Sequence, residues 1–280
     1  MQVLAKGVVM PKQYSFKTDK VLKRYWEDIS EVTQYLWQKG WAERNAGNLS
    51  IDITGEVAAP KEFSQYMKYP LQKCGKNLAG RLFITTITGA RLRDIAKDRE
   101  NTLLVVMIAK DLSGYYVLNV KKGAAKKATS EFPSHLMVHG MLRASNSPKR
   151  AVIHTHPNNL IALSQMKEFK NEAKLNAVLF GMHPEVRVVL PKGVGFAPYR
   201  CPGSLDLAEA TIGSLKGKSI TVWEKHGVVS AGVDIFESFD FIDTIAKAAD
   251  IYFLCKMAGE EPEGLSGAQL KEIDGAFGNS

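Results

Sequence analysis

Two histidines, His154 and His156, stand one residue apart at the end of the apolar segment 150–156. Successive side chains of a strand point to opposite faces, so both imidazoles would lie on one face, about 6.6 Å apart along the strand. Thr155 would point to the other face. The two histidines could share one metal ion, or they could be hydrogen-bonded histidines of the core. Their spacing alone leaves both interpretations open.

A third histidine, His226, ends another predicted strand, "SITVWEKH". Three histidines and one open coordination position are typical of a catalytic zinc site rather than a structural one. His135 and His139 stand four residues apart on a predicted helix, but they lack the glutamate of an H-E-x-x-H zinc motif. We interpret these two as packing or hydrogen-bonding residues. His183 lies in a predicted loop and carries little information.

Glu131 is the first acidic residue of a predicted helix, directly after Thr129 and Ser130. A carboxylate at that position is favoured by the helix dipole, so Glu131 could be only a capping residue. It could also be the general acid and base of a metal site. The sequence does not decide between these roles.

Three segments have the composition of a phosphate site. Glycine turns and helix N-termini offer backbone N–H groups to anions, although each segment could also be an ordinary turn. Taken together with the net charge of +8, they predict a phosphate-binding pocket. The motifs of the common nucleotide-binding loops are absent from the sequence. The candidate residues are Asn45, Gly47, Asn48, Thr88, Gly89, Thr129 and Ser130.

The chain has 280 residues, with 37 lysines and arginines against 29 aspartates and glutamates. We expect a single domain over 1–280, with 1–20 as a possible N-terminal extension. The dense basic run 121–127 contains no aromatic residue, so a small phosphorylated substrate is favoured over nucleic acid. Three widely spaced cysteines indicate a reducing compartment. We saw no signal peptide or membrane span, and we expect a cytoplasmic protein without a membrane partner.

Hydrophobic periodicity predicts the elements that position these residues. Helices are expected over 21–42, ending near Gly40, over 130–145, with Thr129 or Ser130 as the N-cap, from Pro157 onward, and over about 235–258. Strands are expected over 48–53, 81–87, 102–110, 114–120, 150–156, 185–191 and 219–226. Segments 102–110 and 114–120 should form a hairpin. Because helices and strands alternate irregularly, we expect helices packed on a mixed sheet.

Five segments, in order, carry a family resemblance: "GWAERNAGNLS", "TSEFPSH", "VIHTHPNNLIALS", "VVLPKGVGFAPYRCPGS" and "KHGVVSAG". They resemble the zinc-dependent class II aldolases, and the resemblance covers most of the chain. It is strongest to the members that cleave L-rhamnulose 1-phosphate to dihydroxyacetone phosphate and L-lactaldehyde. The resemblance implies an α/β fold, namely a three-layer α/β/α sandwich around a mostly antiparallel mixed sheet. It also implies a homotetramer with one Zn²⁺ per subunit.

The resemblance also implies residue roles. His154, His156 and His226 match the zinc ligands, and Glu131 matches the catalytic acid and base. Glu185 matches a second glutamate near the aldehyde end of the substrate. Asn45, Asn48, Thr88, Thr129 and Ser130 match the family's phosphate pocket, and Gly47 matches a backbone contact near the substrate. One loop departs from the family pattern, because Ile87 and Thr88 replace a glycine and a serine there. We expect this loop to be stiffer.

Several alternatives stay open. An L-fuculose-1-phosphate aldolase, or a sugar-phosphate epimerase or dehydratase on the same scaffold, would need the same metal and phosphate sites. Only product analysis separates these enzymes. A non-catalytic oligomerising module of the same fold is a further alternative, but such a module is expected to lack the three histidines. A zinc hydrolase is supported by nothing beyond the histidines.

Overall fold

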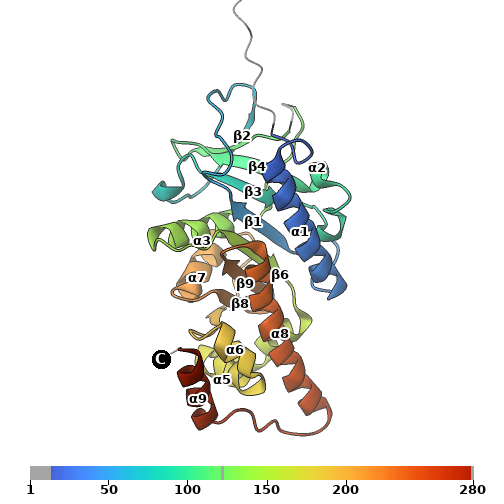
Figure 1. Cartoon of the computed structure of the whole chain (residues 1–280), viewed down its shortest axis with the longest axis vertical. Helices are drawn as coiled ribbons and strands as arrows, with labels where there is room; N and C mark the ends of the chain where they lie inside the picture. The colour runs from blue at the N-terminus through green and yellow to red at the C-terminus, as the bar shows by residue number, and fades with distance from the viewer. Residues whose placement is uncertain (1–13, 121–122, 279–280) are drawn as a thin grey trace, which may run out of the picture.

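The computed structural model describes residues 14–120 and 123–278. Its strands form one sheet in the order β2-β5-β4-β3-β1-β6-β9-β8-β7 (Figure 1). Among these strands the neighbouring pairs are antiparallel, except the parallel pair β7–β8. The predicted mostly antiparallel mixed sheet is therefore confirmed. The strands are β1 Asn48–Asp52, β2 Met67–Pro70, β3 Leu82–Thr86, β4 Leu103–Ile108, β5 Gly114–Val117, β6 Ala151–Thr155, β7 Gly195–Ala197, β8 Ile220–Trp223 and β9 Gly227–Gly232.

Helices cover both faces of this sheet, which gives the predicted three layers (Figure 1). Helices α1 (Lys20–Gln38), α4 (Asn158–Gln165) and α8 (Ile235–Met257) cover one face, and α3 (Phe132–Ala144) and α7 (Leu205–Leu215) cover the other. Successive side chains of β6 point to opposite faces of the sheet, so they enter two different apolar layers. Ile153 belongs to the core beneath α1 and α8, whereas Val152 belongs to the core beneath α3 and α7. The even-numbered residues of β6, His154 included, therefore share the face of α3.

Shorter elements complete the described chain. Helices α5 and α6 contact α8, and α6 also contacts α9. These elements are η1 Lys76–Leu78, η2 Leu92–Asp94, α2 Arg99–Thr102, η3 Lys167–Lys170, α5 Glu172–Met182, α6 Pro184–Val189 and α9 Gly267–Phe277.

Most of the expected elements are present. Helix α1 ends at Gln38, and Gly40 follows in the left-handed region with φ of 72°, as expected for a helix end. The strands β4 and β5 form the predicted hairpin. Helix α4 begins directly after Pro157, where a proline fits without loss of a helical hydrogen bond.

The predicted strand 185–191 is wrong, because this segment contains α6. Its alternating valines are typical of a strand, but two helix-start signals precede them. Pro184 occupies the first turn of α6, and the His183 side chain accepts a hydrogen bond from the backbone N–H of Glu185. Val186 is then buried on the inner face of the helix. Local capping and tertiary packing outweigh β-propensity here.

Two further details differ from expectation. Strand β8 ends at Trp223, so His226 lies in the turn between β8 and β9 rather than on a strand. The N-cap position of α3 is Glu131, not Thr129 or Ser130, and its side chain makes no capping hydrogen bond. The strands β2, β7 and β9 and the helices α5, α7 and α9 were not predicted.

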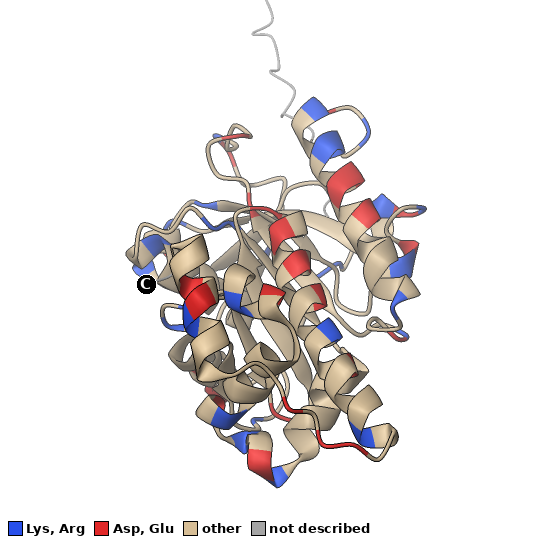
Figure 2. Cartoon of the chain, turned by 60° about the horizontal axis from the view of Figure 1, so that its bottom comes forward, with Lys and Arg blue, Asp and Glu red and all other residues tan. Residues whose placement is uncertain are grey.

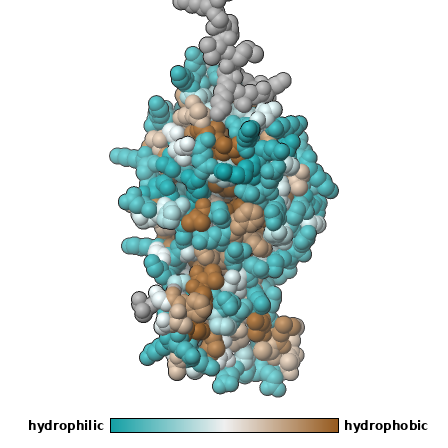
Figure 3. Space-filling model, viewed as in Figure 1, coloured by the Kyte–Doolittle hydropathy of each residue, from teal (hydrophilic) through white to brown (hydrophobic). Residues whose placement is uncertain are grey.

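Charged positions of both signs are mixed along the helices seen in Figure 2. Figure 3 shows apolar residues at the lower right of that view, over the C-terminal end of α8 as placed in Figure 1. Leu254 and Met257, in that end of α8, are 60% and 75% exposed. The described part of the chain has no helix long and apolar enough to cross a membrane. The expected N-terminal extension 1–20 and the basic run 121–127 fall partly outside the described residues.

Candidate metal centre and active site

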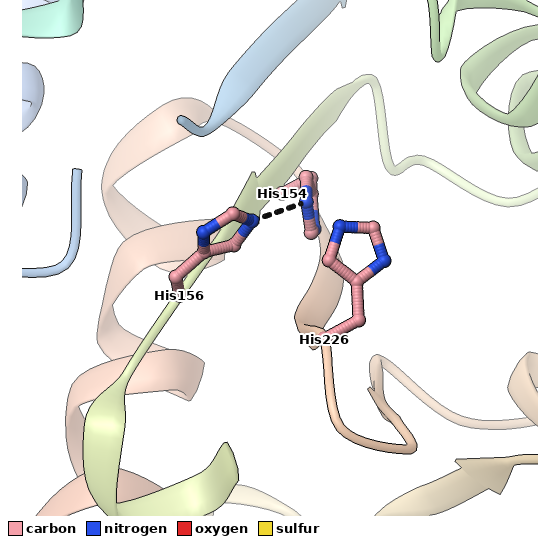
Figure 4. A group of neighbouring side chains, drawn as sticks. All are labelled: His154, His156 and His226. Atoms are coloured by element: carbon pink, nitrogen blue, oxygen red, sulfur yellow. Dashed lines mark hydrogen bonds between the residues drawn. The ribbon is translucent and has the colours of Figure 1, made fainter. Parts of the chain in front are cut away.

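Three imidazoles converge where β6 ends beside the β8–β9 turn (Figure 4). His154 lies in β6, His156 directly follows the end of β6 at Thr155, and His226 directly precedes β9. One ring nitrogen can be taken from each histidine so that the three nitrogens all lie within 4.8 Å of one another. Thr155 points elsewhere, because its hydroxyl donates to the carbonyl oxygen of Trp41. The predicted geometry of the H-x-H segment is confirmed.

The hydrogen bonds of these rings leave lone pairs facing the centre of the cluster. His154 Nδ1 donates to the carbonyl oxygen of Val228 at 2.9 Å, so its neutral ring keeps a lone pair on Nε2. His156 Nδ1 lies 3.1 Å from the Glu43 carboxylate, which can only accept when ionised. The two Nε2 atoms are 3.1 Å apart. Facing lone pairs repel unless a cation or a shared proton lies between them, so this donor set fits a metal ion.

Burial keeps two of the three rings, those of His154 and His226, in the form that binds metal. It lowers the pKa of His154 well below the ordinary value, and His156 lowers it further. Burial and the neighbouring His154 lower the pKa of His226 to about 3, although Glu131 acts in the opposite direction. Only a neutral imidazole has a lone pair for coordination. Both ligand candidates are therefore neutral at physiological pH.

An aromatic side chain packs against two of the three rings. Trp223, the last residue of β8, is buried. Its ring centroid lies 4.5 Å from that of His154 and 5.0 Å from that of His226, with interplanar angles of 33° and 36°. These contacts restrict the rotation of both imidazoles. Trp223 was not predicted as a site residue.

Glu131 faces the histidines rather than the backbone of its helix. Its Oε2 lies 3.4 Å from His154 Nε2, and its Oε1 lies 3.6 Å from His226 Nε2. Asn48 Nδ2 donates to Oε2 at 2.7 Å. The strand pairing explains this contact, because Asn48 in β1 is the register partner of His154 in β6. A role for Glu131 in helix capping alone is therefore not supported.

The predicted phosphate residues line the same cavity as the histidines and Glu131. The cavity has a volume of about 190 Å³. Gly47 has φ of 79°, in the left-handed region that strains other residues, and a Cβ there would come within 3.2 Å of the carbonyl oxygen of His154, so this turn favours glycine. None of the described lining residues is a lysine or arginine, so hydroxyl and N–H groups are its anion donors. The lining consists of Asn45, Ala46, Gly47, Asn48, Ile87, Thr88, Gly89, Ala90, Thr129, Ser130, Glu131, His154, His156 and His226.

Glu185 is the one predicted site residue outside this cavity. It lies in the first turn of α6, and its predicted contact with the aldehyde end stays a prediction. Glu43, whose carboxylate orients His156, is a site residue that was not predicted from the sequence. The residue stands two positions before Asn45, and only the fold brings it to the ring. Ile87 also lines the cavity, where the family pattern has glycine.

Comparison with known proteins identifies the family of this chain. Residues 27–253 match the family model for the Class II Aldolase and Adducin N-terminal domain. A rhamnulose-1-phosphate aldolase of Bacteroides thetaiotaomicron is 39% identical, with 89% of this chain and 92% of that protein covered. Another of Escherichia coli O1:K1 is 33% identical over 90% of this chain and 93% of that protein. A crystal structure of a sugar-phosphate aldolase from Thermotoga maritima is 32% identical, with a TM-score of 0.74 and coverage of 87% and 100%.

The three converging histidines agree with the metal dependence of class II aldolases. The family match spans most of the chain, and the relatives cover it nearly end to end. The chain thus belongs to the class II aldolase family, and it is an aldolase, a carbon–carbon lyase, similar to rhamnulose-1-phosphate aldolases.

Proposed function

We propose that this aldolase cleaves L-rhamnulose 1-phosphate to dihydroxyacetone phosphate and L-lactaldehyde with Zn²⁺ as its metal. The observation that carries the proposal is the placement of the Glu131 carboxylate, 3.4 and 3.6 Å from two of the three histidine Nε2 atoms, in a cavity lined by hydroxyl and N–H groups. The relatives named above support the choice of substrate, because they carry the name of this activity.

The side chains divide the work between them. His154, His156 and His226 would hold the zinc ion, since three imidazoles with an open position suit catalytic zinc. When bound, the metal supplies Lewis-acid stabilisation of the negative charge that develops on the ketose oxygens. Glu131 exchanges the proton at C3 of the three-carbon product: it protonates that carbon after cleavage and removes the proton in the direction of synthesis.

The phosphate end of the substrate would lie against the turns of the cavity. Thr88, Thr129 and Ser130 offer hydroxyl groups there, and the turns at Gly47 and Gly89 offer backbone N–H groups. Binding of the phosphate orients the C3–C4 bond toward the metal centre and Glu131, and so lowers the entropic cost of reaching the transition state.

The assay uses purified protein with L-rhamnulose 1-phosphate and detects dihydroxyacetone phosphate through a coupled reduction. Cleavage should stop when a chelator removes the metal and return when Zn²⁺ is added. Activity that survives with metal shown to be absent would overturn the metal-dependent mechanism. L-Fuculose 1-phosphate is the competing substrate, and a higher kcat/KM for it would reassign the substrate.

Glu131→Gln separates chemistry from metal binding. The amide keeps the size of the side chain but cannot take up the proton at C3, so turnover should fall by at least about 100-fold. Zinc content, measured by atomic absorption, should stay at one ion per subunit. Undiminished turnover would remove Glu131 from the chemistry.

We further infer that the chain is one domain that assembles as a homo-oligomer, with a tetramer expected, in the cytoplasm. The exposed apolar side chains at the end of α8, Leu254 and Met257, support an interface, because exposed apolar patches mark association surfaces. Light scattering of the purified protein should give four times the subunit mass.

A further inference from the structure

A line of buried polar side chains connects Glu131 to the interior of the molecule. Glu131, His135 and His139 stand four residues apart at the start of and along α3, so they share one face of that helix. Asn48 and Ser50 stand two residues apart in β1 and share the face of the strand toward α3. The two rows interdigitate, and each is buried.

Every link in this line is a short hydrogen bond. Asn48 Nδ2 donates to Glu131 Oε2 at 2.7 Å, and Asn48 Oδ1 lies 2.6 Å from His135 Nε2. His135 Nδ1 lies 2.8 Å from Ser50 Oγ, which in turn lies 2.8 Å from His139 Nε2. Beyond it, His139 Nδ1 is buried and has no hydrogen-bond partner among the described residues. The line therefore starts at the candidate active site and ends in the core.

The chemistry of the groups sets the direction of all these bonds. An ionised carboxylate only accepts, so the amide nitrogen of Asn48 faces Glu131 and its oxygen faces His135. His135 must then carry its proton on Nε2, and the ring is neutral because burial lowers its pKa. Its bare Nδ1 accepts from the Ser50 hydroxyl, and Ser50 accepts from His139 Nε2. Each donor points toward Glu131, and the unpartnered atom at the far end is a bare nitrogen.

We propose that His135 is a positioning residue for Glu131. It holds the Asn48 amide in the one orientation that can donate to the carboxylate, and Ser50 and His139 hold His135 in the required tautomer. This inference rests on the proposed function, in which Glu131 moves the proton at C3. The neighbouring groups of the line, rather than the metal centre, then determine where that carboxylate sits.

A core network that serves stability alone would have the same hydrogen bonds, so the experiment must separate the two roles. The probe is dihydroxyacetone phosphate with zinc-loaded enzyme in D₂O, without aldehyde. Exchange of one hydroxymethyl proton, followed by proton NMR, reports only the step assigned to Glu131. Zinc content, the dissociation constant of dihydroxyacetone phosphate and the melting temperature are measured in parallel.

His135→Leu removes both ring nitrogens. We expect exchange to slow by about 10- to 100-fold, the effect of a misplaced catalytic group, with zinc content and dihydroxyacetone phosphate affinity unchanged. His135→Gln places an amide donor near the position of Nε2 and should recover most of the lost rate. Thr211→Val is the matched control, because it removes a buried hydroxyl of α7 whose one hydrogen bond among the described residues is to the carbonyl of Leu207. It should lower the melting temperature without slowing exchange.

The outcomes separate the inference from the function beneath it. If the wild type exchanges the proton and folded His135→Leu exchanges it at the same rate, the positioning role alone is overturned. No exchange and no cleavage by the wild type overturns the proposed function and this inference with it. If His135→Leu does not fold, Ser50→Ala decides. Slower exchange by Ser50→Ala with unchanged zinc content and dihydroxyacetone phosphate affinity supports the role, and exchange at the wild-type rate overturns it.

Discussion

Each imidazole of the candidate metal centre is oriented by a contact that either the ring edge facing away from the cluster or the ring face makes. His154 is 1% exposed, donates to the carbonyl of Val228 and stacks on Trp223. His156 is oriented by Glu43 instead, whose side chain is 65% exposed to solvent. His226 Nδ1 is buried without a partner among the described residues, so Trp223 holds that ring mainly by packing. The three candidate ligands are thus held with unequal rigidity.

Glu43→Gln tests the contact to His156. The change removes the negative charge that fixes the orientation of the ring, so zinc affinity should fall by about tenfold, the low end for such partners because Glu43 is exposed. Competition against a chromophoric chelator measures the affinity. Glu62→Gln, at another exposed glutamate, is the control. Equal affinities for the two variants would mean that Glu43 has no part in the site.

At the scale of elements, the site depends on the close approach of β9 to the end of β6. These strands are antiparallel neighbours, and Gly227 begins β9 immediately after His226. A Cβ on Gly227 would lie 2.4 Å from the carbonyl oxygen of Thr155 and 2.9 Å from His156 Cδ2. Glycine is required here by the space available between two strands, not by its own backbone angles.

Gly227→Ala should therefore push the β8–β9 turn away from β6. Because the neighbouring atom is backbone, the strain cannot be relieved by a rotamer change, and stability should fall by about 1–3 kcal/mol. Zinc binding should weaken with it, since His226 moves with the turn. Urea unfolding and zinc titration measure both effects. Gly213→Ala, in α7 where a Cβ meets no atom within 4 Å, should instead stabilise by about 0.5–1 kcal/mol.

At the scale of the whole molecule, the two histidines buried between α3 and β1 make folding sensitive to mild acid. Burial is the largest cause that lowers the pKa of His139 to about 4, opposed by Asp52 and assisted by Arg143 and Arg81. Burial likewise lowers the pKa of His135 well below its ordinary value. The unfolded chain binds these protons near pH 6.5, whereas the native protein does not.

Stability should consequently fall as the pH drops from about 6.5 to about 4, because only the unfolded state takes up the protons in that window. His139 alone contributes a loss of about 3 kcal/mol across it, from a pKa that moves from 6.5 to about 4. Urea unfolding of wild type and His139→Leu at several pH values measures this. The variant should lose less stability across the window, and identical pH dependence in the two proteins would refute the prediction.

Much of this protein is determined by local sequence. The alternation in 150–156 determines that His154 and His156 share a face, because strand side chains alternate whatever surrounds them. Residue type determines the chemistry available: imidazoles for a metal, a carboxylate for a proton, and hydroxyl and glycine turns for an anion. The helix around Leu36 and the hairpin 102–120 follow from periodicity and turn residues, and the structure has both.

Tertiary structure determined which strands, helices and side chains contact one another. The place of β1 next to β6 sets Asn48 opposite His154, and the contact of α3 with β1 sets Glu131 against both. The segment 185–191 became a helix once its proline start and the burial of Val186 outweighed its strand-like valines. Such pairings can join residues far apart in the chain, as Asn48 and Glu131 are, 83 positions apart, and they depend on which apolar faces bury each other. The spacing of residues along the chain does not specify which faces pair, whereas the packed core does.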